Sequence, residues 1–183
     1  MSDGAVSTAA AHNSTERTTE EKVADAIRAA PAFISDSATV VDRDLRTVLR
    51  QGTSEWTCVP SSPGVPWPNP MCADPTTMQW FKEIGQGKVP TINRVGISYM
   101  LMGETGADFD HPELESPPED GDWYRVGPHV MFVFPQSAGD ITRGIGHDTS
   151  SGAPYVRPFD GAQPLLVVPI ALPNEEIRTT PPS

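Results

Sequence analysis

Residues 56–74 have the sequence WTCVPSSPGVPWPNPMCAD and contain both cysteines of the chain, Cys58 and Cys72. Five of these residues are proline, which cannot donate a hydrogen bond to a helix or to a sheet ladder. We therefore expect the segment to be irregular, apart from a short strand that its first residues could form. Because it also carries two tryptophans, we expect it to be ordered rather than a slack linker.

The two cysteines form a C-x13-C pattern, which is not the C-x-x-C spacing of redox motifs. No histidine lies near them in the sequence, and two thiols alone do not make a structural zinc site. We predict a Cys58–Cys72 disulfide, which would stabilise the folded chain by about 3 kcal/mol and would indicate an oxidising compartment. Separate buried thiols are the alternative, and metal binding or catalysis by the thiols is a third interpretation.

The charge balance limits the class of protein. The chain has 183 residues and a formal net charge of −11, from 24 acidic and 13 basic residues. Without a basic run that could replace counterions along phosphate, we do not expect nucleic-acid binding. An acidic surface favours solubility, and no stretch approaches the roughly 20 apolar residues of a membrane span.

The N-terminus as written lacks the basic segment and apolar run of a signal peptide. The protein would be exported or periplasmic if a leader precedes this sequence, and cytoplasmic otherwise. The Ser/Thr/Ala-rich residues 1–18 and the tail 179–183 are predicted to be disordered, which leaves 19–178 as a single domain.

The predicted fold class is α+β, with a mainly antiparallel sheet of about five or six strands, two packed helices and long proline-rich loops. Apolar and β-branched runs predict the strands, because such runs are typical of strands that are central or covered on both faces. The predicted strands are a hairpin over 38–51, a short strand over 56–59, and three longer strands over 95–101, 130–134 and 165–171.

Two helices carry clear start signals. Thr18 and Glu21 form a capping box, and apolar residues then recur at helical spacing until Pro31 ends the helix. Asp74 is a good N-cap for the second helix, and Gly85 is its stop signal. The predicted buried face of this second helix is Met78, Phe81 and Ile84, with Trp80 beside it.

His129 is the strongest candidate for chemistry. It follows Gly127-Pro128, at the start of a predicted strand, where the backbone would hold it precisely. We predict His129 as an acid/base or ligand group, with Tyr99 and Asp110 as further catalytic candidates. The alternative is a partly buried histidine whose hydrogen bonds are satisfied. Tyr124 and Tyr155 could be acid/base groups or pocket walls, but no spacing argument selects them.

The same region could hold a metal ion. His111 stands in an acidic run with Glu104 upstream, and these two with His129 are the ligand types that zinc or a non-haem metal takes. A divalent transition metal is therefore the cofactor to consider, and an ordinary acidic loop is the alternative. The chain has no nucleophile elbow, no Walker loop and no dinucleotide fingerprint, so the sequence predicts no particular reaction.

Several motifs together resemble a family of uncharacterised bacterial proteins, over roughly residues 38–170. The resemblance implies export, in agreement with a disulfide, but no assigned activity. In that family the last strand usually opens with a second histidine, where this chain has Leu165, so a family site built from two histidines would have lost one here. The motifs are LRQG (49–52), EWTCVP (55–60), NPMCAD (69–74), VGISYML (95–101), GDW (121–123), GPHVM (127–131) and PYV (154–156).

Two functions follow as hypotheses. The first is a small-molecule-binding or catalytic domain, with a pocket where the acidic loop 104–127 meets the strand that begins near His129. Glu104, Asp108 and Asp110 would supply carboxylates there, and Tyr99 and Trp123 the walls. The second is a non-catalytic protein-interaction or self-assembling domain, including a homo-oligomer, that uses the Pro/Trp loop 59–70 with Trp67 as anchor.

Overall fold

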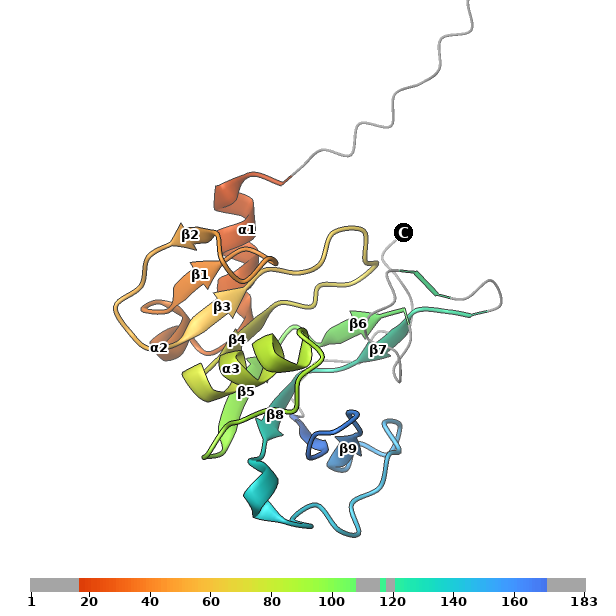
Figure 1. The fold of residues 1–183 in the computed structure, drawn as a ribbon. Helices are drawn as coiled ribbons and strands as arrows, with labels where there is room; N and C mark the ends of the chain where they lie inside the picture. Colours follow the sequence, from red (N-terminus) through yellow and green to blue (C-terminus); the bar gives the residue numbers. More distant parts are fainter. Residues whose placement is uncertain (1–16, 108–115, 118–120, 171–183) are drawn as a thin grey trace, which may run out of the picture.

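The computed structural model describes residues 17–107, 116–117 and 121–170, drawn in colour in Figure 1. Most of the predicted disordered ends lie outside these residues. Arg17 and Thr18 are described, and both make hydrogen bonds within the folded domain.

The main sheet has eight strands in the order β2-β1-β3-β4-β5-β8-β10-β9, so the expected number of five or six was too low. All neighbouring strands are antiparallel except β1 and β3, which are parallel. The sequence missed β4 and β9, because a strand of three residues is too short to show a period of two. The strands are β1 (Thr39–Val41), β2 (Val48–Arg50), β3 (Thr57–Val59), β4 (Met71–Ala73), β5 (Gly96–Met100), β8 (His129–Val133), β9 (Tyr155–Arg157) and β10 (Leu165–Pro169).

The short strand expected at the start of residues 56–74 is present as β3, but the expectation that the rest of the segment is irregular was wrong at its end, where β4 forms. Strands β3 and β4 pair there in antiparallel register, with Cys58 opposite Cys72. All five prolines fall within 60–70, between the two strands, so the strand residues keep their backbone N–H groups.

The loop 104–127 also has regular ends. Strand β6 (Glu104–Gly106) pairs with β7 (Tyr124–Val126) in a separate two-stranded sheet. Figure 1 shows these two strands extending away from the main sheet beside β8. This pairing places Glu104 in a defined backbone position.

The structure has three α-helices in its described residues, where two were expected. Helix α1 (Thr19–Ala26) begins with the predicted capping box and continues into a 3-10 turn, η1 (Ile27–Ala29). Pro31 ends this segment as predicted, but it is also the N-cap of a further one-turn helix, α2 (Ala32–Ser35). Helix α3 (Pro75–Ile84) begins at Asp74, whose side chain accepts a hydrogen bond from the Thr77 N–H. Among the described residues, none of the helices has the length and apolar character needed to cross a membrane.

The buried face of α3 differs from the predicted one. Thr76, Thr77 and Trp80 are buried, whereas Met78, Phe81 and Ile84 are only partly buried. The helix can approach the sheet at Thr77 because β5 has a glycine there. A Cβ at Gly96 would lie 2.5 Å from Thr77 Oγ1, which is too close for any other residue.

Two hydrophobic cores lie on opposite faces of the main sheet. Cys72 pairs with Tyr99 and packs under α1, η1 and α2, whereas the next pair, Ala73 and Ser98, points to the face that carries α3. On this second face, Trp80 packs with apolar side chains of β5, β8 and β10. The two clusters consist of Ala26, Ala29, Ala30, Ile34, Ala38, Val40, Cys58 and Cys72 on the first face, and Trp80, Ile92, Met100, Val126, Met131, Val133, Tyr155, Leu165 and Val167 on the second.

Candidate functional site

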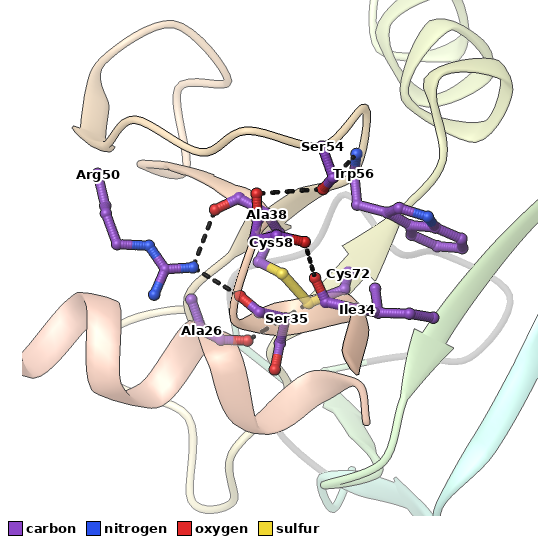
Figure 2. The surroundings of a disulfide bond; sticks show 10 residues. Ala26, Ile34, Ser35, Ala38, Arg50, Ser54, Trp56, Cys58 and Cys72 are labelled. Atoms are coloured by element: carbon purple, nitrogen blue, oxygen red, sulfur yellow. Dashed lines mark hydrogen bonds between the residues drawn. A yellow bond between two sulfur atoms is a disulfide. The ribbon is translucent and has the colours of Figure 1, made fainter. Parts of the chain in front are cut away.

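The predicted disulfide is confirmed: Cys58 and Cys72 are bonded across β3 and β4, and both are fully buried. Figure 2 shows the sulfurs between the end of α1 and the chain around Ile34 and Ala38. Beside them the Arg50 guanidinium donates hydrogen bonds to Ser35 O at 2.6 Å and to Ala38 O at 2.9 Å. The two ends of the proline-rich loop are therefore held in place by a covalent bond within a packed core.

The loop between the cysteines is also held by hydrogen bonds. The Asn69 side chain accepts from Ser62 N at 2.8 Å and donates to Thr105 O at 3.0 Å, which joins the loop to β6. On the other side, Ser61 N donates to Asp25 Oδ2 of α1 at 2.7 Å. These contacts agree with the expectation of an ordered loop.

A cleft of about 720 Å³ lies between this loop, the start of α1 and the β1–β2 turn. One wall is polar and the other is largely proline, valine and tryptophan. The cleft is lined by Arg17, Lys22, Asp25, Asp42, Arg43, Ser61, Ser62, Pro63, Gly64, Val65, Pro66, Trp67 and Pro68. We call it the loop cleft.

The charges of the loop cleft are only partly paired. Arg17 lies 2.9 Å from Asp25, and Lys22 lies 2.7 Å from Asp42. The hydrogen bond from Lys22, with a second from the Arg43 backbone N–H, lowers the pKa of Asp42, so that its carboxyl is ionised at neutral pH. The Arg43 guanidinium has no carboxylate within ion-pair distance among the described residues, and its Nη1 donates only a long 3.5 Å hydrogen bond to Pro60 O.

A second polar group lies beneath the surface, where β6 and β7 meet the main sheet. Oε1 of Glu104 accepts hydrogen bonds from Tyr124 Oη at 2.6 Å and from Arg157 Nη1 at 2.8 Å. The other oxygen, Oε2, lies 3.8 Å from Nε2 of His129. We call Glu104, Tyr124, His129 and Arg157 the buried polar cluster. These residues belong, in that order, to strands β6, β7, β8 and β9.

The ring of His129 is fully buried. Nδ1 lies 2.7 Å from Gly127 O, a contact in which the nitrogen carries the proton and donates to the carbonyl. Nε2 has no hydrogen-bond partner among the described residues. Burial lowers the pKa of His129, although the nearby Glu104 opposes that effect, so the imidazole is neutral at neutral pH with the lone pair of Nε2 toward Glu104.

The carboxylate and the phenols of this region keep their ordinary charge states. Burial alone would raise the pKa of Glu104, but the attraction of Arg157 and His129 and the hydrogen bonds from Tyr124 and Arg157 outweigh it, and the pKa is lowered. Burial, and then the Glu104 charge, raise the pKa of Tyr124 and of Tyr155. The cluster thus combines a carboxylate, a guanidinium, a neutral imidazole and a protonated phenol.

The structure brings together only part of the predicted site. Glu104 and His129 are neighbours, as expected. Tyr99 is not part of this group, because its ring lies on the opposite face of the sheet, 5.7 Å from that of Trp56. Asp110 and His111, with Asp108, lie outside the described residues. Sequence reasoning missed Arg157, since an arginine within an apolar run gives no signal of its partner 53 residues away.

No three metal-ligating side chains come together in the described part of the chain. Glu104 and His129 supply two of the three predicted ligands, and the third, His111, belongs to the residues not described. Leu165, which stands where the resemblance implies a second histidine, is buried and pairs with Arg157 of β9. It lies four residues along β10 from Pro169, the partner of His129, or about 13 Å at the rise of a strand.

Comparisons of the chain with protein-family models, with curated proteins and with solved structures found no match. The resemblance to an uncharacterised bacterial family therefore stays a prediction. The functional interpretation depends on the two sites themselves.

Proposed function

We propose that this protein is a binding domain that holds a small ligand in the loop cleft. This proposal joins the two sequence hypotheses, since it takes the small-molecule ligand from the first and the Pro/Trp loop from the second. The observation that carries it is a cleft of about 720 Å³, in the range of small-molecule sites, one wall of which is a loop tied at both ends.

The fixed walls matter because ordering a loop on binding costs free energy. Here the disulfide joins the two strands that flank the loop, and the contacts of Ser61 with Asp25 and of Asn69 with Thr105 tie the first and last residues of the loop to α1 and β6. Trp67 is further held by the Arg125 guanidinium, whose Cζ lies 5.4 Å from the centre of the indole ring. A ligand would meet a preformed surface.

The test is an NMR screen of the isotope-labelled protein against a library of small aromatic and aliphatic fragments. We expect fragments that bind to shift the Trp67 indole N–H and the backbone amides of 61–67. Trp67→Ala should weaken these fragments, whereas Phe33→Ala, which removes an aromatic ring that is 80% exposed and is not among the cleft-lining residues, should not. A screen in which no fragment shifts the cleft resonances would refute the proposal.

Self-assembly through the same loop is the competing interpretation, and light scattering separates the two. If the Trp67→Ala substitution changes the molar mass in solution, the loop is a contact surface between copies of the chain. An unchanged mass together with weaker fragment binding supports the ligand site.

A second candidate function places chemistry at His129, as the first sequence hypothesis did. The observation that favours it is the buried Nε2 without a hydrogen-bond partner, 3.8 Å from a carboxylate, which is an arrangement suited to accepting a proton or binding a cation. Titration of the protein with Zn²⁺, followed through the imidazole NMR signals of wild type and of His129→Gln, tests it. Zn²⁺-dependent shifts of the His129 signals in the wild type alone would support this role, and their absence would leave a structural histidine.

A further inference from the structure

We infer that the ligand of the loop cleft is a small organic carboxylate whose apolar part lies against the Pro/Trp loop and whose carboxylate pairs with Arg43. This inference rests on the proposed function and deepens it by naming the chemical class of the ligand.

The first argument is the charge of the lining. The cleft has three cations, Arg17, Lys22 and Arg43, and two carboxylates, Asp25 and Asp42. The chain as a whole carries a formal charge of −11, so a locally positive lining is an exception to its overall character. An anion that approaches this cleft meets attraction, whereas the overall charge of the protein repels it.

The second argument is the pairing within that lining. The two aspartates each hold one cation by a short contact, Asp25 with Arg17 and Asp42 with Lys22. Asp42 also accepts a hydrogen bond from the backbone N–H of Arg43 at 2.8 Å, whereas the Arg43 guanidinium donates a long hydrogen bond to Pro60 O and has no carboxylate partner in the described part of the chain. Arginine presents a planar pair of N–H donors that matches a carboxylate, so this is the group best suited to bind one.

The third argument is the opposite wall. Val65, Pro66, Trp67 and Pro68 present an apolar surface that cannot satisfy a second charge. An apolar or aromatic body with a carboxylate at one end complements both walls, whereas a dianion or a neutral polar molecule complements only one.

The experiment compares aromatic carboxylates with their primary amides, which have the same shape and no charge. Suitable pairs are phenylacetate with phenylacetamide, 3-phenylpropionate with 3-phenylpropionamide, and indole-3-acetate with indole-3-acetamide. Binding is measured by NMR titration of the cleft resonances with wild type and three variants, Arg43→Gln, Arg43→Lys and Arg46→Gln. Arg46 is the matched control, because it is an exposed arginine of the same turn that does not line the cleft.

For at least one pair we expect the wild type to bind the acid about ten-fold more tightly than the amide. Arg43→Gln should abolish this preference, Arg43→Lys should retain part of it, and Arg46→Gln should leave it unchanged. Since Arg43 is exposed, the variants should keep the thermal midpoint of the wild type, which is checked by circular dichroism.

Two negative results have different meanings. If acids and amides shift the cleft resonances with equal affinity, the assignment of a carboxylate is overturned while the proposed binding function stands. If neither acids nor amides shift them, the assignment of a carboxylate is overturned, and the fragment screen decides whether the proposed binding function stands. A preference for acids that survives Arg43→Gln would also overturn the role of Arg43.

Discussion

Arg157 donates a hydrogen bond of 2.8 Å to the carboxylate of Glu104, and the two side chains are only 7% and 15% exposed. Glu104 belongs to the two-stranded sheet and Arg157 to the edge strand of the main sheet. The ion pair therefore joins the two sheets at a place that excludes most water.

Removing one partner of this buried ion pair should strongly lower the free energy of unfolding. We predict that Glu104→Ala lowers the free energy of unfolding by about 3–5 kcal/mol, since it takes the carboxylate from a buried guanidinium and from the Tyr124 hydroxyl. Asp140→Ala is the matched control, because the Asp140–Arg143 pair is exposed and should contribute less than about 1 kcal/mol. Urea unfolding of the three proteins measures both values, and equal losses would contradict the structural role assigned to the buried pair.

The buried histidine should make stability depend on pH. Burial lowers the pKa of His129 in the folded protein, whereas the unfolded chain takes up the proton near the ordinary value of 6.5. Unfolding is therefore favoured as the pH falls below about 6.5, by up to about 1.4 kcal/mol per pH unit. In His129→Gln this slope should decrease between about pH 6.5 and pH 5. Urea unfolding across that range measures it, and an unchanged slope would show that the histidine titrates normally.

The contribution of Glu104 to stability changes at a lower pH than that of His129. Its pKa is lowered in the folded state. The stabilisation by the ionised carboxylate is therefore complete above the ordinary pKa of 4.5 and is lost as the pH falls through the folded-state pKa. Glu104→Gln should therefore be less sensitive to acid than the wild type below about pH 4.5, although it is less stable at neutral pH. Acid titration followed by near-ultraviolet circular dichroism tests this, and parallel curves for the two proteins would contradict it.

The disulfide should contribute a large part of the stability. Replacing both cysteines, as Cys58→Ala with Cys72→Ala, should lower the free energy of unfolding by about 3 kcal/mol, because the unfolded chain gains the entropy of the open loop. The native protein should react with no thiol reagent, since both cysteines are bonded, and should yield two thiols after unfolding and reduction. A reductant that leaves the thermal midpoint unchanged would contradict this prediction.

The core on the α3 face should depend on one tryptophan. Trp80 is fully buried and contacts Phe81 and Phe159, with ring centroids 5.1 and 4.8 Å away. Trp80→Ala should cost about 3–5 kcal/mol, whereas Phe33→Ala, at a ring that is 80% exposed, should cost less than about 0.5 kcal/mol. Urea unfolding measures both, and a small loss for Trp80→Ala would show that the core can repack.

Part of the fold was predictable because some signals are local. The capping box of Thr18 and Glu21 acts across three residues, and Asp74 caps its helix in the same way. The hairpin at 38–51 has a β-rich run followed by turn residues, and the longer strands show continuous apolar runs. By contrast, β4 and β9 have three residues each without such a signal beside them, and their strand conformation depends on pairing with neighbouring strands.

The candidate site was less predictable, since it depends on which strands become neighbours. Glu104 and His129 were selected one at a time from the sequence, and their proximity results from the β6–β7 pairing beside β8. Tyr99 was expected beside His129 but lies on the other face of the sheet with Trp56, because strand pairing decides which face each residue occupies. The loop cleft was not predicted, as its polar wall comes from α1 and the β1–β2 turn and its apolar wall from the proline-rich loop.

The amino-acid order alone was enough for the starts of α1 and α3, the mainly antiparallel α+β class and the ordered loop between two cysteines, since these depend on residues a few positions apart or on composition. The tertiary structure decided that the two thiols form a disulfide and that Arg157 pairs with Glu104. It also decided that Arg43 lines a cleft in which no carboxylate of the described residues lies within ion-pair distance of its guanidinium. The physical reason is that pairing of strands and packing of helices bring together groups that the chain separates by many residues, and no local pattern encodes those distances.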